Sequence, residues 1–219
     1  MLTLAEEFLL LAYDDHKGTP RVPQYGLPYG LAGAVLMELA LRGIVRQEDN
    51  KLYLTAAEKI EADAEFGPLA SYVKEKSDQL GRPKSLKYWV LGLGKQVKRT
   101  AYRPYLLERL KTKGLLTSRK EKYFIFFTMT VYPSIDVGAK EEIRKRVREA
   151  VLDTYTPVDE RTTMLISLLK ACRADRHLFS QAEYKTVKQR MTQVMKEEPY
   201  GHAISKAILE LQASTQVYE

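Results

Sequence analysis

The sequence contains few cysteine and histidine residues, which form the disulfides of small secreted domains and bind transition metals. Its 219 residues include one cysteine, Cys172, and three histidines. A single cysteine excludes an intramolecular disulfide framework and a thiolate-rich metal site, and it fits a reducing compartment. The histidines at positions 16, 177 and 202 lie far apart with no carboxylate or cysteine at ligand spacing. We therefore expect no metal site.

The sequence also lacks a long hydrophobic segment. Its longest apolar run, residues 8–12, is far shorter than the roughly 20 residues that a membrane-spanning helix needs. The start, Met1-Leu2-Thr3, has the features of neither a signal peptide nor an N-myristoylation site. With 45% hydrophobic and 29% charged residues, the composition is that of an ordinary globular chain. We expect a soluble, cytoplasmic protein that reaches a membrane only from outside.

Recognisable catalytic motifs are missing as well. Residues 92–95 (GLGK) resemble part of a phosphate-binding loop, but the first glycine, the following Ser or Thr and a preceding strand are absent. No Gly-x-Ser-x-Gly motif is present. Carboxylate pairs such as Glu141 and Glu142 stand in charge-balanced stretches that are typical of a solvated helix face. The sequence therefore predicts no enzyme and no cofactor.

Positive charge is concentrated in one part of the chain. Residues 82–122 hold thirteen Lys or Arg against two Glu, a net charge of +11, whereas the whole chain carries +7. The remaining residues therefore carry −4. Such a region attracts polyanions, whether nucleic acid, an anionic membrane or an acidic partner. A solvated helix face is the alternative interpretation.

Periodicity and capping patterns predict a mainly α-helical fold. A capping box from Thr3 to Glu6 opens a first helix at 4–14. Proline and glycine exclude regular helix from 16 to 28, and a second helix begins near 29 and ends at Gly43. Further helices are expected at 56–65, 67–81, a segment capped by Ser85, 106–113, 139–152, 160–173, 180–197 and 203–212.

Two of these helices are each followed by a glycine and a predicted hairpin. The first hairpin spans 44–55 around Asp49-Asn50. The second spans 123–130 and follows Gly114 and the basic stretch 119–122. Together the patterns predict one mainly α domain over residues 1–219 with one or two short β-hairpins.

The second hairpin contains four consecutive large apolar residues: Phe124, Ile125, Phe126 and Phe127. In a strand with one buried face, about two of them would point outward. A core strand buried on both faces is one explanation. The other is a wedge that inserts into lipid, where two rings and four nearby cations would contribute roughly 7–10 kcal/mol before the cost of immobilisation.

Two other functions fit parts of the pattern. A helix followed by a two-stranded wing resembles a winged-helix nucleic-acid-binding protein. However, the tip of the first hairpin, residues 47–50 (QEDN), would repel a phosphate backbone, and the apolar run has no use on a duplex. The leading interpretation therefore includes no nucleic acid. A third possibility is a protein–protein adaptor that dimerises through the second hairpin.

Several stretches resemble the Golgi phosphoprotein three family. They are, in the family's order, residues 2–11 (LTLAEEFLLL), 30–43 (GLAGAVLMELALRG), 113–116 (KGLL), 128–133 (TMTVYP) and 159–162 (DERT). The resemblance implies a mostly α-helical, non-enzymatic domain that binds phosphatidylinositol 4-phosphate on a cytosolic membrane face and inserts an apolar hairpin beside a basic pocket. It also implies a possible membrane-protein client, because eukaryotic members retain glycosyltransferases in the Golgi.

The resemblance also indicates candidate headgroup residues. The family's pocket uses a tryptophan and three arginines, and the matching positions are Pro23, Ala32, Thr100 and Arg103. Arg103 alone is retained. Three other cations lie within two residues of the lost positions: Lys98, Arg99 and Arg21. We therefore expect a rearranged anion site built from these three and Arg103. The supporting cations are expected to be Lys95, Arg119, Lys120 and Lys122.

The start of the chain differs from that of the eukaryotic members. It begins at the first core helix, without the arginine-bearing extension through which those adaptors engage coat proteins. The resemblance is therefore to a prokaryotic or otherwise reduced member, and it does not extend to coat binding.

Overall fold

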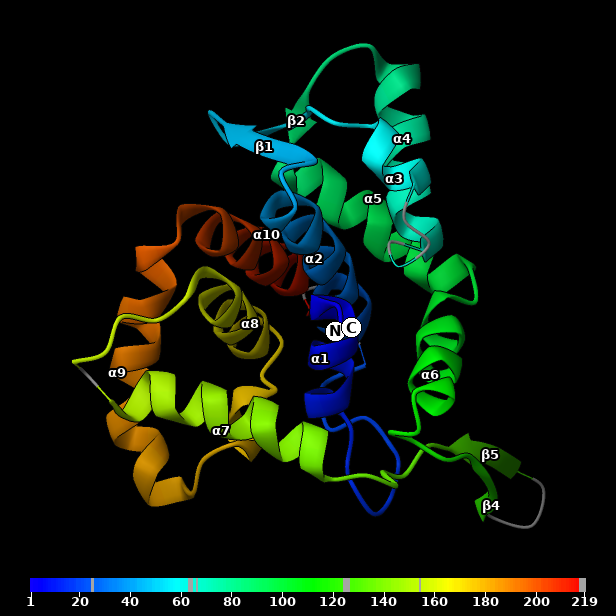
Figure 1. Ribbon diagram of the computed structural model, residues 1–219, viewed down its shortest axis with the longest axis vertical. Helices are drawn as coiled ribbons and strands as arrows, with labels where there is room; N and C mark the ends of the chain where they lie inside the picture. The colour runs from blue at the N-terminus through cyan, green and yellow to red at the C-terminus, as the bar shows by residue number, and fades with distance from the viewer. Residues whose placement is uncertain (25, 63–64, 66, 124–126, 154, 217–219) are drawn as a thin grey trace.

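Figure 1 shows a computed structural model of the chain, which describes residues 1–24, 26–62, 65, 67–123, 127–153 and 155–216. The helices are α1 (Leu4–Ala12), α2 (Gly26–Leu41), α3 (Glu58–Ala62), α4 (Gly67–Leu80), α5 (Leu86–Arg99), α6 (Tyr102–Thr112), α7 (Gly138–Leu152), α8 (Glu160–Ala171), the 3-10 turn η2 (Asp175–His177), α9 (Gln181–Glu197) and α10 (Pro199–Gln216). The strands are β1 (Val45–Glu48), β2 (Lys51–Leu54), β3 (Lys84–Ser85), β4 (Arg119–Tyr123) and β5 (Phe127–Val131). The predicted mainly α fold with short hairpins is confirmed.

The core is built around α2, which is buried along most of its length and lies among α1, α5, α8 and α10 (Figure 1). Glycine makes this close packing possible. A Cβ at Gly30 would overlap the Phe8 ring of α1 and the sulfur of Cys172, and one at Gly33 would press on Ile204 and other side chains. The small residues of α2 therefore let large side chains of its neighbours reach its backbone.

Buried carboxylates connect α1 and α2 to later helices. Glu7 of α1 accepts a hydrogen bond from Arg146 of α7 at 2.6 Å. Glu38 of α2 accepts one from Arg161 of α8 at 3.2 Å. Because both carboxylates are almost fully enclosed, these charged hydrogen bonds offset the cost of their desolvation.

Several helix ends differ from the sequence predictions, mostly because of proline. α2 begins at Gly26 rather than near residue 29, and α6 begins at Tyr102 rather than 106. Pro28 and Pro104 fall within the first turns of these helices, where a missing N–H costs no helical hydrogen bond. α10 likewise begins at Pro199, four residues earlier than expected.

The small strand β3 was not predicted. It pairs with β2 in an antiparallel register in which Lys84 lies opposite Leu52, so that the first hairpin becomes a three-stranded sheet. Two residues are too short for a hydrophobic alternation to show in the sequence. Ser85 ends this strand and caps α5 as predicted, accepting a hydrogen bond from the backbone N–H of Tyr88.

The turn of the first hairpin and the glycine caps of both helix–glycine–hairpin units are confirmed. Asp49 and Asn50, at the tip of the first hairpin, have φ of 49° and 58°, as a tight two-residue hairpin turn requires. Gly43 and Gly114, which follow α2 and α6, have φ of 64° and 73°. Both glycines therefore adopt the left-handed conformation that ends a helix.

The second hairpin begins earlier than predicted. The basic stretch 119–122, expected to precede it, is most of its first strand, because Arg119 pairs with Val131 and Tyr123 with Phe127. The hairpin projects away from the helices (Figure 1), and Lys120 and Lys122 are exposed. Its described part is therefore not a strand pair enclosed by the core. Phe124, Ile125 and Phe126 lie outside the described residues.

Candidate functional site

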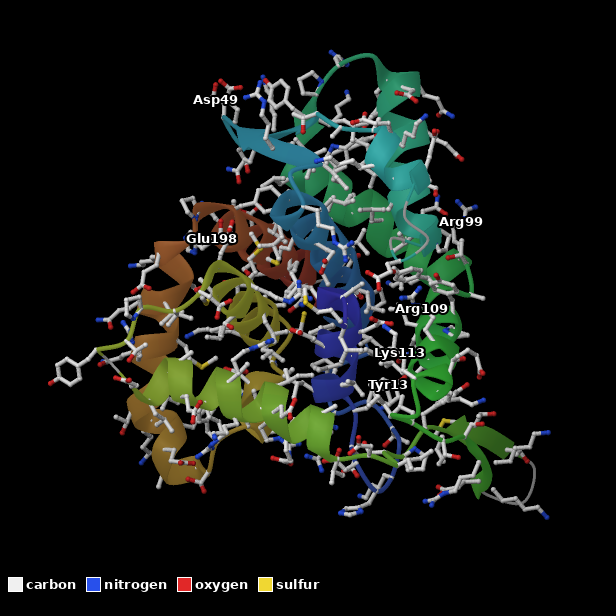
Figure 2. All side chains as sticks on the ribbon, viewed as in Figure 1. Tyr13, Asp49, Arg99, Arg109, Lys113 and Glu198 are labelled. Carbon is white, nitrogen blue, oxygen red and sulfur yellow. The ribbon has the colours of Figure 1, made fainter. Side chains whose placement is uncertain are left out.

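Three of the predicted headgroup residues gather where α5 meets α6. Lys98 and Arg99 end α5, and Arg103 belongs to the first turn of α6. Lys95 lies one turn earlier than Lys98 and Arg99, so it shares their helix face. All four side chains are exposed, and Figure 2 shows Arg99 on the outer edge of the molecule. We call these four cations the α5–α6 corner.

The corner carries uncompensated positive charge. Within the part of the chain that the structure describes, no carboxylate forms an ion pair with any of its four cations. The first turn of α6 adds to this charge, because its N-cap residue, Ala101, has no side chain that can accept from the free backbone N–H groups. Cations beside an uncapped helix N-terminus form a surface that is suited to a phosphate or another anion.

An aromatic ring supports one of these cations. The ammonium of Lys98 lies 5.4 Å from the ring centroid of Tyr29, a cation–π contact. The Tyr29 ring packs against α5 where Gly94 leaves room for it, since a Cβ there would overlap the ring. Tyr29 was not predicted as part of the site. The available signal was Gly94, a small residue one helical turn before Lys98.

The charge of Arg103 acts on Tyr13, at the end of α1. Burial raises the pKa of the Tyr13 hydroxyl, while the positive charge of Arg103 opposes this rise and nearby Tyr132 adds to it. No described residue forms a hydrogen bond with the Tyr13 hydroxyl, whereas its backbone carbonyl accepts one from Lys140. Sequence reasoning missed this tyrosine pair, because Tyr13 and Tyr132 are brought together only by the fold.

Arg21 is placed differently from the other predicted headgroup residues. Its Nε donates to Oδ2 of Asp14 at 2.9 Å, in the loop between α1 and α2. Hydrogen bonds from the Lys17 backbone and from Arg21 hold the pKa of Asp14 well below its usual range. The charge of Arg21 is therefore partly neutralised in place, and its role as a headgroup ligand stays a prediction.

The supporting cations divide between the two ends of α6. Lys95 belongs to the corner, whereas Arg119, Lys120 and Lys122 belong to the hairpin, which lies roughly 16 Å away along the 11-residue helix. Arg119 Nε donates to Oε1 of Glu121 at 2.8 Å. Lys120 and Lys122 point to the other face of the ribbon, and within the described chain neither forms an ion pair.

Part of the positive charge of residues 82–122 is neutralised within the fold. Arg109 and Lys113 donate to the fully buried carboxylate of Glu6, at 3.0 and 2.9 Å. Figure 2 shows both cations on the side of α6 that faces α1. Lys87 and Lys111 pair with Glu210 and Glu108. Within residues 82–122, the cations that form no ion pair with a described residue lie at the corner, on the hairpin and at the start of the stretch (Arg82 and Lys84).

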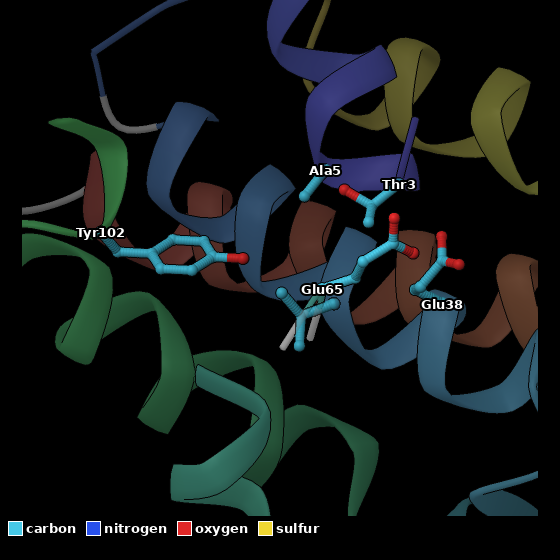
Figure 3. Close-up of a pocket in the computed structure, with 6 residues that line it drawn as sticks. Thr3, Ala5, Glu38, Glu65 and Tyr102 are labelled. Atoms are coloured by element: carbon cyan, nitrogen blue, oxygen red, sulfur yellow. The ribbon is translucent and has the colours of Figure 1, made fainter. Parts of the chain in front are cut away.

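One small cavity lies between the start of α1 and the start of α6. It has a volume of about 10 Å³ and is lined by Thr3, Ala5, Val35, Glu38, Glu65 and Tyr102 (Figure 3). This volume holds roughly one water molecule. Among the described helices, none has the length and apolar character needed to cross a bilayer.

Comparison with known proteins agrees with the family that the sequence motifs indicated. The family model described as Golgi phosphoprotein 3 (GPP34) matches residues 4–211. A curated relative is vacuolar protein sorting-associated protein 74 of Schizosaccharomyces pombe, which is 29% identical over 180 residues; the match covers 72% of this chain and 50% of that protein. The chain thus spans about half the length of this relative. Because the family model covers nearly the whole sequence, the chain belongs to the Golgi phosphoprotein 3 (GPP34) family.

Proposed function

We propose that the protein attaches peripherally to the cytosolic face of a membrane by binding anionic phospholipid. The expected headgroup is a phosphoinositide such as phosphatidylinositol 4-phosphate. The observation that carries this proposal is the α5–α6 corner, where four exposed cations without carboxylate partners among the described residues adjoin the uncapped start of α6. Membership of a Golgi phosphoprotein family supports a role at a membrane.

Electrostatic attraction at the corner is too weak to act alone. Each Lys or Arg near an anionic leaflet contributes about 1 kcal/mol, so four contribute about 4 kcal/mol. That free energy corresponds to a dissociation constant of about 1 mM and is reduced further by salt. Stable attachment therefore needs a second contribution.

The projecting hairpin can supply that contribution. Strands β4 and β5 extend beyond the helical body (Figure 1), and residues 124–126 lie between them in the sequence. Two apolar side chains inserted into the acyl region would add roughly 3–6 kcal/mol. Lys120 and Lys122 would remain at headgroup level, as cations flanking an inserted segment usually do.

In this proposal the protein catalyses no reaction and needs no cofactor. It acts as a binding module that holds a membrane-protein client at the surface to which it attaches. The name of the Schizosaccharomyces pombe relative refers to vacuolar protein sorting, which fits a role of this kind.

Vesicle co-sedimentation tests the headgroup site. The protein is mixed with neutral phosphatidylcholine vesicles and with vesicles that contain phosphatidylserine or phosphatidylinositol 4-phosphate. We expect binding to both anionic types, strongest with the phosphoinositide, and roughly a tenfold or greater loss for Arg99→Ala combined with Arg103→Ala. The matched control is Lys87→Ala combined with Lys111→Ala, which removes two cations that are already paired. Equal losses for the two double variants would contradict the proposed site.

The hairpin is tested with Phe126→Ser combined with Phe127→Ser. Leu152→Ser combined with Leu209→Ser is the control, because these exposed apolar residues lie outside the hairpin. Unchanged vesicle binding by the hairpin variant would exclude insertion. A change of elution volume in size-exclusion chromatography, without a change in vesicle binding, would favour dimerisation through the hairpin. A salt-dependent shift on duplex DNA with no vesicle binding would favour the nucleic-acid alternative.

A further inference from the structure

The segment that joins β5 to α7 exposes two aliphatic side chains at the base of the hairpin. Ile135 is 62% exposed and Val137 is 50% exposed. They lie four and six residues after the end of β5, and Val137 immediately precedes α7. These are two large aliphatic residues, separated in sequence by Asp136 alone, that the described chain leaves uncovered.

This segment is held firmly although it has no regular secondary structure. The Tyr132 N–H donates to the Gly18 carbonyl at 2.8 Å, the Ser134 N–H to the Asp15 carbonyl at 2.9 Å, and the Ile135 N–H to the Leu115 carbonyl at 3.0 Å. The backbone is thus fixed from both sides by residues distant in sequence. Its two aliphatic side chains form a preorganised contact, which loses little entropy when a partner covers it.

The charged groups around the segment are of both signs. Its one acidic residue, Asp136, accepts a hydrogen bond from the Gly138 N–H at 2.7 Å. In the neighbouring α1–α2 loop, Asp15 is bound by Lys140 and Arg144. Lys17 in the same loop is exposed and, within the described chain, has no ion pair. Asp15 is therefore neutralised by two cations and Lys17 is free, while Asp136 keeps its charge without a cation among the described residues.

The position of the segment identifies the partner. The segment and the α1–α2 loop lie on the same end of the molecule as the hairpin, and the segment continues directly from β5 (Figure 1). If the hairpin inserts into a membrane, Ile135 and Val137 at its base would be the next residues to contact the membrane surface. We infer that Ile135 and Val137 form a second apolar contact with the membrane surface, at the base of the inserted hairpin. This inference rests on the proposed function.

Tryptophan fluorescence tests the inference. The native Trp89 is buried in the core, so its emission provides a constant background. Ile135→Trp is mixed with vesicles of phosphatidylcholine and phosphatidylinositol 4-phosphate whose acyl chains are brominated. We expect a blue shift and quenching of the added tryptophan. The matched control is Leu209→Trp, on exposed α10 surface away from the hairpin, whose emission should not change.

The outcomes separate this inference from the proposed function. If Ile135→Trp co-sediments with vesicles but is not quenched, the second contact is wrong and the proposed function stands. If the unaltered protein does not bind vesicles, both fail. A blue-shifted emission of the added tryptophan in the absence of vesicles, together with elution of the protein as a dimer in size-exclusion chromatography, would also overturn the inference.

Two further variants guard against a misfolded probe. Val137→Trp should give the same quenching as Ile135→Trp. Ile135→Ser combined with Val137→Ser should weaken vesicle binding by roughly tenfold or more, because two aliphatic contacts are removed. Unchanged binding by this double variant would overturn the inference as well.

Discussion

The ammonium of Lys140 lies 2.7 Å from Oδ1 of Asp15, and Lys140 is almost completely buried. Lys140 also donates to the Tyr13 carbonyl at 2.7 Å, and Asp15 accepts from the Ser134 hydroxyl at 3.0 Å. This ion pair therefore joins the α1–α2 loop, the base of the second hairpin and α7. The ion pair therefore holds together the elements from which the hairpin projects.

Removing Lys140 should destabilise the protein strongly. Lys140→Met leaves the Asp15 carboxylate with Arg144 but without its closest cation, so we expect the free energy of unfolding to fall by about 2–4 kcal/mol. Urea denaturation measures this change. Lys145→Met, on the exposed side of the same helix, should change stability by less than about 0.5 kcal/mol. Equal effects of the two substitutions would show that the buried Lys140–Asp15 pair contributes no more to stability than an exposed pair.

The buried carboxylate of Glu6 should make stability depend on pH. Burial alone would raise the pKa of Glu6, but hydrogen bonds from Lys113, Thr3 and Arg109 outweigh it, and the pKa lies below its usual 4.5. Ionised Glu6 therefore stabilises the fold above about pH 4.5, and this contribution is lost as the pH falls through the folded-state pKa. Glu6→Gln should cost most at neutral pH and progressively less in acid.

Urea denaturation of both proteins between pH 7 and pH 3 checks this expectation. The quantity to follow is the difference in free energy of unfolding between the unaltered protein and Glu6→Gln. Glu149→Gln, at an exposed position on α7, serves as the control and should show a small difference at every pH. A Glu6→Gln difference that stayed constant with pH would rule out a role for its ionisation.

Two glycines with the same φ of 64° should respond differently to alanine. At Gly43 nothing lies within 4 Å of an added Cβ, so Gly43→Ala should cost only the left-handed strain of about 1–2 kcal/mol. At Gly18 the Cβ would overlap the backbone of Tyr132 and Pro133. Gly18→Ala should therefore cost about 3 kcal/mol or more, since backbone must move. Thermal denaturation would reject this account if the two variants melted together.

A second glycine pair tests the packing under the corner. Gly92 and Gly94 both lie in α5, so alanine gains about 1 kcal/mol of helix propensity at either position. An added Cβ at Gly92 meets nothing within 4 Å, so Gly92→Ala should stabilise the protein by that amount. At Gly94 it would overlap the Tyr29 ring, and Gly94→Ala should destabilise by about 1–3 kcal/mol. Calorimetric melting temperatures that moved in the same direction would contradict this.

Local features of the fold could be predicted because their causes are local. The capping box of Thr3 and Glu6, the caps at Ser85 and Ser180 and the turn at Asp49-Asn50 all depend on residues within three positions of one another. The predicted starts of α2, α6 and α10 lie too far along the chain. Proline was taken to exclude a helix, but it is disfavoured only in a helix interior and is accepted in the first turn.

The distribution of free charge could not be predicted, because its causes are distant in sequence. Arg109 lies 103 residues from Glu6, whose carboxylate it binds, so the acid that neutralises it stands outside the basic stretch. The same holds for Tyr13 and Tyr132, which come close to each other only after the chain has folded. The corner cations were identified from a family resemblance, and the sequence alone did not distinguish them from their paired neighbours.

The placement of the α5–α6 corner and the hairpin at opposite ends of one helix has a consequence for how the proposed attachment would behave. α6 is a rigid connector, so the first of the two contacts to form would hold the second close to the same surface. The second step would then be intramolecular, at an effective concentration in the millimolar range. Two contacts that are each short-lived would together give a long residence time, and loss of either would return the protein to rapid exchange.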